Sequence, residues 1–465
     1  MEPKDKKIKK RNETNDLTEG NLFKKVIQFA LPLILTGVLQ LFFNAADVVV
    51  VGNFATPTAL SAVGSTTALI NLIVNMLLGL SVGAGVVVAN AFGSKDDKSM
   101  EETVHTAMLS AVIGGFILLA IGQIFSERIL VLMGTPSDVI DQASLYVRIY
   151  FIGIPFTAVY NFGAAILRAV GDTKRPLYFL IISGIINVVF NLFFVIVFKM
   201  DVAGVATATV ISQVISSVLV VIYLTRVNSS HKLVFKNLRI VGKTFRRILF
   251  IGFPAGLQGS IFSISNILIQ SGINSFGSVA MAGVAASANI EGFIYTAMNA
   301  FHHTTINFVG QHIGAKKVER IKNIAWVCLI YVTSVGLIFG LMNYLLGRFL
   351  LSLYVSGEES YVNEVIKYGL IGLKSKGLFL FICGIMEVMS GLLRGMGKSL
   401  SAMIMTLTCV CGIRVLWLYT VFAVRKELAV LFLSYPVSWL VCIIGETIAF
   451  LVIYKRLLKT SDKIE

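Results

Sequence analysis

The chain has 465 residues, of which 56% are hydrophobic and 14% charged, and its formal net charge is +15. Soluble globular proteins carry about 25% charged residues, and a mean hydropathy of +0.82 is too apolar for a water-soluble core. The composition therefore excludes a soluble multidomain protein and predicts an integral membrane protein. The basic charge does not indicate nucleic-acid binding, because Lys and Arg lie in short clusters between long apolar runs rather than on one face.

Long apolar runs are the main pattern along the chain. A membrane-spanning helix needs about 20 mostly apolar residues, and the sequence contains twelve such runs: 26–52, 59–92, 102–124, 142–168, 176–198, 202–225, 246–275, 280–311, 322–346, 361–393, 401–423 and 429–454. The first run follows a polar tail, 1–20, and is too long for a signal peptide, so we expect no cleavage. The fold class expected is all-α and integral to the membrane, with twelve transmembrane helices in two pseudo-symmetric six-helix bundles.

Basic residues are distributed unequally between the two sides that these spans define. The side of the N-terminus includes the loops after the second, fourth, sixth, eighth and tenth spans and the C-terminus. This side holds 30 Lys and Arg residues, and the other side holds 5. Short loops rich in Lys and Arg stay in the cytoplasm. We therefore expect a multi-pass protein of the plasma (cytoplasmic) membrane with both termini cytoplasmic.

The sequence also repeats itself. Pro32 and Asn44 match Pro254 and Asn266 at an offset of 222 residues, and Leu167-Arg168 matches Leu393-Arg394 further along. An even number of helices in each copy gives both copies the same orientation, which is a transporter architecture with the substrate site between the halves. The segments expected are a cytoplasmic tail 1–20, an N-lobe 21–225, a basic linker 226–245, a C-lobe 246–454 and a tail 455–465.

The order of several short motifs resembles that of the multidrug and toxic compound extrusion (MATE) family, in particular its bacterial branch. The motifs are Leu31-Pro32, the run from Asn44 to Asp47, the run from Leu167 to Lys174, Asn187, the run from Ala208 to Gln213, and the run from Leu393 to Gly397. What the resemblance implies is secondary active multidrug efflux: an inward proton or sodium ion drives export of cationic amphipathic compounds through alternating access of two six-helix lobes.

Asp47 is the leading candidate for a functional acid. A charged side chain inside the bilayer is costly, and no basic residue lies within a turn or two of Asp47. It lies 15 residues beyond Pro32, or about 22 Å along a helix axis, which places it in the outer half of the membrane. Because Pro32 can bend the helix and burial disfavours the charged carboxylate, we expect protonation of Asp47 to be coupled to the bend. The alternative is an Asp paired to a polar neighbour for packing alone.

The resemblance implies that Asp47 shares a cation site in the N-lobe with polar residues of three other helices. The matching positions are Asn161, Asn187, Asn191 and Thr209. Asn191 departs from the family, in which a second Asp often stands at that position, and the single remaining carboxylate can take one proton or help to coordinate sodium. Ordinary hydrogen bonding between helices, worth about 0.6 kcal/mol each, is an equally weighted alternative for the four residues.

The predicted C-lobe carries charged residues of its own. The repeat aligns Glu387 with Asn161, because each lies seven residues before the Arg of its Leu-Arg motif, so Glu387 is expected to face the cavity. Glu291 has no Lys or Arg within ten residues, and Arg414 is the counter-charge expected for one of the two acids. The alternatives are a structural Glu–Arg pair and an unpaired Glu that binds a substrate cation or a proton. Glu446 is assigned no role.

No enzyme chemistry is expected. Gly397-Lys398-Ser399 resembles the end of a phosphate-binding loop, but Leu392 stands where its first Gly is required. The His residues lack the spacing of a zinc helix, so we expect no metal and no cofactor beyond H+ or Na+ as the coupling ion. The partners expected are organic cation substrates and the lipid bilayer, with no nucleic acid, and the protein is expected to be monomeric.

Two other functions remain open. A flippase for a lipid-linked precursor, from the wider superfamily with the same topology, predicts a cavity dominated by Arg and Lys. A channel or receptor predicts a continuous pore or a ligand-binding soluble domain.

Overall fold

The computed structural model describes residues 16–54, 56–355 and 358–461. Most of the expected tail 1–20, and residues 462–465 of the expected tail 455–465, lie outside these residues. The first half of the chain forms α1 (Leu22–Phe54), α2 (Pro57–Gly93), α3 (Asp97–Leu132), α4 (Ile140–Ala169), α5 (Lys174–Leu192), the π-helix η2 (Phe193–Val197) and α6 (Asp201–Arg226).

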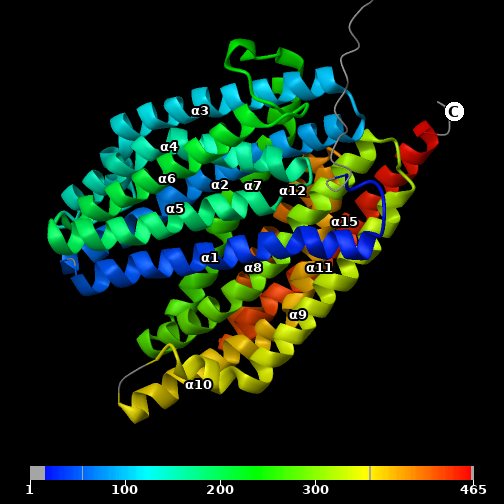
Figure 1. Cartoon of the computed structure of the whole chain (residues 1–465). Helices are drawn as coiled ribbons and strands as arrows, with labels where there is room; N and C mark the ends of the chain where they lie inside the picture. Colours follow the sequence, from blue (N-terminus) through cyan, green and yellow to red (C-terminus); the bar gives the residue numbers. More distant parts are fainter. Residues whose placement is uncertain (1–15, 55, 356–357, 462–465) are drawn as a thin grey trace, which may run out of the picture.

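The second half contains more and shorter elements. After a short 3-10 turn, η3 (Phe235–Asn237), come α7 (Gly242–Asn274), α8 (Ser278–Gly314), α9 (Arg320–Ser352), α10 (Glu359–Ser375), η4 (Gly377–Phe379) and α11 (Leu380–Gly395). The chain ends with α12 (Ser399–Thr406), the π-helix η5 (Leu407–Gly412), α13 (Ile413–Tyr419), α14 (Val421–Val424) and α15 (Leu428–Ser461). Figure 1 shows α3 to α6 gathered on one side of the molecule and α9, α10, α11 and α15 on the other.

The predicted spans correspond to these elements. Eleven described segments are long and apolar enough to cross a membrane. The remaining predicted span, 280–311, is the continuous helix α8, which has 37 residues and is not among those eleven. The all-α membrane fold with twelve long helical segments is therefore confirmed.

The two halves share lengths and turns. α1 and α7 have 33 residues each, and α2 and α8 have 37 each. The turn after α2 places Lys95 at φ 57°, and the turn after α8 places Lys316 at φ 58°. Positive φ is uncommon for a residue with a Cβ, so the same conformation at matching places is a structural sign of the repeat.

The halves meet through glycines. A Cβ added at Gly79 of α2 would overlap the backbone of Gly256 of α7, and one added at Gly83 would overlap the backbone of Ile248 and Gly252. Small residues four apart let helix backbones approach closely in a membrane. At the ends of α2 and α8, Gly93 and Gly314 make similar contacts with the partner helix. These contacts close one end of the interface between the halves.

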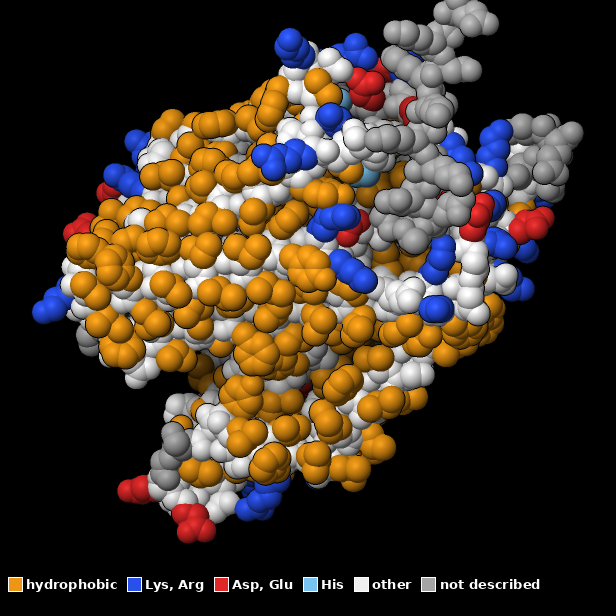
Figure 2. Space-filling view, viewed as in Figure 1, with side chains coloured by type: hydrophobic (Ala, Val, Ile, Leu, Met, Phe, Trp, Pro, Cys, Tyr) orange, Lys and Arg blue, Asp and Glu red, His pale blue; other side chains and the backbone are white. Residues whose placement is uncertain are grey.

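The other end of this interface is open. The beginning of α1 and the end of α15 lie at the same end of the molecule (Figure 1). Figure 2 shows a hollow between the two groups of helices on the side away from that end. α1 connects the two groups, because Phe29 and Ala30 belong to the apolar core of the second half and Val50 and Val51 to that of the first.

Candidate functional site

Asp47 lies in the last third of α1, where its side chain is partly buried. The buried Asn191, at the end of α5, donates from Nδ2 to Asp47 Oδ1 at 2.5 Å. One turn earlier on α5, Asn187 Nδ2 lies 3.5 Å from the hydroxyl of Thr209 in α6. The structure thus brings four of the five predicted residues together from three helices. Asn161 of α4 makes no hydrogen bond to this group in the described part of the chain.

Two tyrosines near Asp47 were not predicted from the sequence. Tyr146 and Tyr150 of α4 have their ring centroids 6.2 Å apart, and both lie within electrostatic range of the Asp47 carboxylate. Gln213 of α6 lies beside Tyr150. The spacing of four residues between the tyrosines puts them on one helix face, which Asn161 shares at eleven residues beyond Tyr150. Their place on the same helix face as Asn161 was the pattern in the sequence that could have indicated the two tyrosines.

Of the two helices that carry Asp47 and Asn191, α5 departs from regular helical geometry and α1 does not. α5 changes to the π-helix η2 at Phe193, two residues after Asn191, and such segments are frequent at functional sites. α1, by contrast, is continuous through Pro32, whose carbonyl accepts a hydrogen bond from Thr36 Oγ1 at 2.7 Å. The expected role of Pro32 in bending this helix therefore remains a prediction.

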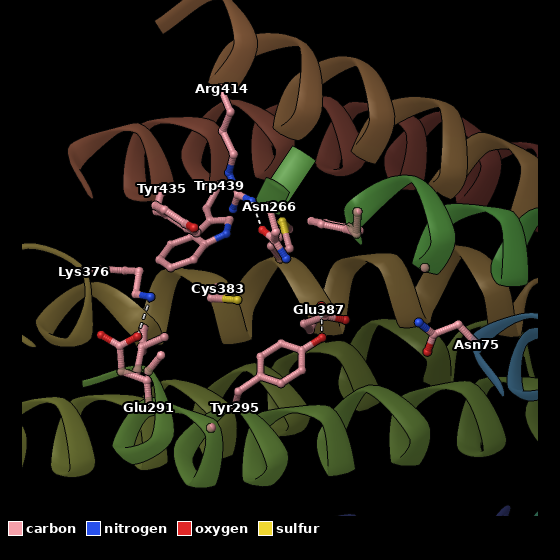
Figure 3. Close-up of a pocket in the computed structure, with 16 residues that line it drawn as sticks. Asn75, Asn266, Glu291, Tyr295, Lys376, Cys383, Glu387, Arg414, Tyr435 and Trp439 are labelled. Atoms are coloured by element: carbon pink, nitrogen blue, oxygen red, sulfur yellow. Dashed lines mark hydrogen bonds and ion pairs between the residues drawn. The ribbon is translucent and has the colours of Figure 1, made fainter. Parts of the chain in front are cut away.

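A second polar site is a pocket of about 440 Å³ in the second half, which Asn75 of α2 borders from the first half. Figure 3 shows its charged groups. Lys376, between α10 and η4, pairs with Glu291 of α8 at 2.5 Å, and both side chains are largely buried. Tyr295, one turn further along α8, donates from its hydroxyl to Glu387 of α11 at 3.3 Å.

Arg414 does not pair with either predicted acid. Its Nη1 lies 3.4 Å from Asn266 Oδ1, its Nε lies 3.3 Å from the Ser438 hydroxyl, and its guanidinium stacks over the Tyr435 ring at 4.1 Å. The expectation that Arg414 is the counter-charge for Glu291 or Glu387 is therefore wrong. The partner of Glu291 is Lys376, which sequence reasoning left unassigned because 85 residues separate the two.

Glu387 belongs to a buried network between the pocket and the contact of the two halves. Its Oε2 lies 3.3 Å from His302 Nδ1, and Arg394 Nη1 lies 3.2 Å from the other nitrogen of that ring. Arg394 also donates to Gln258 Oε1 of α7 at 2.7 Å. Glu446 of α15, also fully buried, accepts from Thr406 at 3.4 Å.

The charges that line the pocket are balanced. Two acids, Glu291 and Glu387, face two bases, Lys376 and Arg414. Tyr295, Tyr435 and Trp439 supply aromatic surface, and Cys383 and Met386 supply soft apolar surface. Aromatic faces attract organic cations, so the pocket combines two acids, two bases and cation-binding rings.

Both halves of the chain match the same protein-family model, MatE, over residues 32–193 and 254–420. The chain therefore belongs to the MATE family of transporters, and it is a multi-pass membrane transporter rather than an enzyme. The two separate matches fall on the two halves that repeat in helix length.

Individual proteins agree with this assignment. The chain is 30% identical over 396 residues to the probable multidrug resistance protein YpnP of Bacillus subtilis, covering 84% of this chain and 86% of that protein. It is 25% identical over 395 residues to the probable multidrug resistance protein NorM of Thermotoga maritima, covering 82% of each. Its fold matches the outward-facing conformation of a multidrug resistance MATE family transporter with a TM-score of 0.89 at 19% identity, covering 97% of this chain and 100% of that one.

Proposed function

We propose that this protein is a multidrug exporter that couples the inward movement of H+ or Na+ to the outward movement of cationic, amphipathic compounds. The observation that carries the proposal is the group around Asp47, a lone carboxylate bonded to Asn191 and placed beside Asn187 and Thr209. A carboxylate inside a membrane protein is expensive and marks ion pathways. The multidrug resistance names of the relatives YpnP and NorM support the export of drugs.

The coupling site in this proposal is centred on Asp47. Its carboxylate accepts the ion, Asn187, Asn191 and Thr209 supply amide and hydroxyl oxygens, and Asn161 completes the site from α4. Because the first part of α1 packs in the core of the second half and the last part in that of the first, a bend at Pro32 would move the two halves relative to each other. Ion binding at Asp47 is thus linked to alternating access through α1.

The substrate site in this proposal is the pocket of the second half. Glu291 and Glu387 attract an organic cation, and the rings of Tyr295, Tyr435 and Trp439 stack on its apolar part. Lys376 pairs with Glu291, so a cationic substrate competes with Lys376 for that carboxylate. Arg414 orients Tyr435 by stacking on it.

The orientation follows from the basic residues. With the N-terminal side in the cytoplasm, the glycine contacts at the ends of α2 and α8 close the cytoplasmic end, and the hollow in Figure 2 opens outward. The division into an N-lobe 21–225, a linker 226–245 and a C-lobe 246–454, in a monomer of the plasma membrane, is part of the same proposal.

Efflux of ethidium from cells tests the role of Asp47. Asp47→Asn keeps the size and the hydrogen bond to Asn191 but removes the charge, so export should be lost while the amount of protein in the membrane is unchanged. Asp138→Asn, at an exposed position between α3 and α4, is the matched control and should export normally. Export by Asp47→Asn at the level of this control would reject the coupling role.

A flippase for a lipid-linked precursor is less well supported. It predicts a cavity dominated by Arg and Lys, whereas the pocket holds as many acids as bases. Lys376 and Arg414 are the groups that favour it, and transport of a lipid-linked anion by purified protein in vesicles would establish it.

A further inference from the structure

A recess of about 360 Å³ lies between α9 and α10 and shares no lining residue with the pocket described above, although its Lys374 stands two residues before Lys376 of that pocket. Three basic side chains line it: Arg348 from α9, and Lys367 and Lys374 from α10. Among the described residues, no acid lines the recess, and no carboxylate pairs with Arg348, Lys367 or Lys374. Glu364, one turn from Lys367, lies outside the lining. The recess is therefore strongly positive.

The recess is built by one face of α10. The α10 residues of the lining are spaced three or four apart, so they share one helix face. They are the polar Asn363, Lys367 and Lys374 and the aliphatic Ile366, Leu370 and Ile371. Arg348 Nη2 donates to Asn363 Oδ1 at 2.9 Å, and this bond between two lining residues holds the guanidinium in the wall of the recess. The lining thus combines donors for an anion with aliphatic surface for a chain.

Arg348 and Lys374 lie at the depth of one of the two membrane surfaces. Lys374 lies close to the depth of Arg348, because its ammonium contacts the ring of Tyr344, four residues before Arg348 on α9. Arg348 lies 26 residues after Lys322 on α9, or about 39 Å. With Lys322 near the opposite surface and a hydrocarbon core about 30 Å thick, Arg348 lies in the headgroup layer and Lys374 about one helical turn deeper.

The surface beside the recess is apolar and exposed. Leu341 and Leu345 precede Arg348 by seven and three residues, on the same side of α9, and their exposed fractions are 52% and 68%. Tyr344 lies next to them and holds the Lys374 ammonium 5.5 Å from its ring centroid. Tyrosine is enriched at the membrane–water interface, so this side of α9 has the character of a lipid-facing surface.

We propose that the α9–α10 recess binds the phosphate group of an anionic membrane lipid, whose acyl chains lie along Leu341 and Leu345 of α9. Basic pockets between transmembrane helices recognise such headgroups, and Arg binds phosphate with a planar pair of donors. Arg348 is one of the 5 Lys and Arg residues counted on this side of the membrane against 30 on the other, and Lys367 and Lys374 belong to neither count, so the charge cluster is not part of the orientation pattern. This inference does not depend on the proposed transport activity.

Crosslinking with a photoactivatable phosphatidylglycerol tests the proposal on the full-length protein in detergent. We expect label on peptides from the end of α9 and from α10, and less label there from the matching phosphatidylcholine analogue. The triple variant Arg348→Gln, Lys367→Gln, Lys374→Gln should weaken binding at this place about a hundredfold, since each basic residue near anionic lipid is worth about 1 kcal/mol.

The control removes three other basic residues from the same membrane side. Arg128→Gln, Arg425→Gln and Lys426→Gln together take away the same charge from exposed positions, and labelling of α9 and α10 should stay at the level of the unchanged protein. Equal loss in the control, or equal labelling by phosphatidylcholine, would overturn the proposal. Displacement of the lipid probe by millimolar inorganic phosphate would show a free-anion site and would overturn the lipid assignment.

Discussion

The pair of Glu291 and Lys376 should be far more important for stability than surface ion pairs of the same chain. Side-chain exposure is 6% for Glu291 and 14% for Lys376. Removing one partner of a buried pair leaves an uncompensated charge and costs about 3–5 kcal/mol. Deprotonating an ordinary lysine at pH 7 costs about 4.6 kcal/mol, which sets an upper limit on the penalty. We therefore expect Glu291→Gln to lower the free energy of unfolding by about 3–4 kcal/mol.

A double-mutant cycle separates the loss of the pair from the loss of each side chain. Lys376→Met alone should also destabilise, whereas the double variant Glu291→Gln, Lys376→Met should lie within about 1 kcal/mol of the unchanged protein, because no buried charge is left unpaired. These differences in the free energy of unfolding are measured by unfolding the purified protein in mixed micelles with increasing amounts of sodium dodecyl sulfate.

Another ion pair of the chain serves as the control. Glu127 and Arg148 lie 3.1 Å apart with side-chain exposures of 62% and 47%, and exposed pairs contribute about 0–1 kcal/mol. Glu127→Gln should therefore change the free energy of unfolding very little. A loss in Glu291→Gln no larger than that in Glu127→Gln, or a double variant as unstable as the single ones, would refute the assignment of a closed buried pair.

Three further predictions concern the interface, the coupling site and the N-terminal segment. Gly79→Val should lower the thermal midpoint because its side chain would overlap α7, whereas Gly114→Val, with open space around it, should not; equal midpoints would contradict the close contact. Asn191→Ala should reduce ethidium export more than Asn187→Ala, because Asn191 bonds to the Asp47 side chain; the reverse order would contradict this site geometry. Burial opposes the charge of Asp16, but hydrogen bonds from Thr18 and the charges of Lys95 and Lys25 together lower the pKa of Asp16 from its ordinary value. The stability that Asp16 contributes is therefore complete above the unfolded pKa and is lost as pH falls through the lower folded pKa. Hydrogen exchange of the segment that follows should rise over that pH range, and a flat profile would contradict this.

Local composition was sufficient to predict the elements of this fold. Each predicted span is an apolar run long enough to cross a bilayer, and the boundary turns repeat in sequence, as Lys95 and Lys316 illustrate. Gly79 and Gly83, and likewise Gly252 and Gly256, stand four residues apart, a spacing typical of close helix packing in membranes, and they meet one another between α2 and α7. These features depend on residues near one another along the chain.

The side-chain partners in the second half could not be predicted in the same way. Glu291 and Lys376 come from segments whose relative rotation is set by packing, so the sequence offered Arg414 as an equally good partner. The π-helices also escaped prediction, because they interrupt apolar runs without a proline, as at Phe193 and Leu407. Around Asp47 the resemblance to the family supplied Asn187, Asn191 and Thr209, but not Tyr146 and Tyr150, which lie on the helix face of α4.

Drug transport in sealed vesicles tests the central claim most directly. Purified protein is reconstituted, and movement of ethidium is followed after a pH gradient is imposed and then, separately, after a sodium gradient is imposed. At least one gradient should drive ethidium against its own concentration gradient, and Asp47→Asn should abolish this movement while Asp138→Asn should not. Transport that ignores both gradients, or that persists in Asp47→Asn, would contradict it.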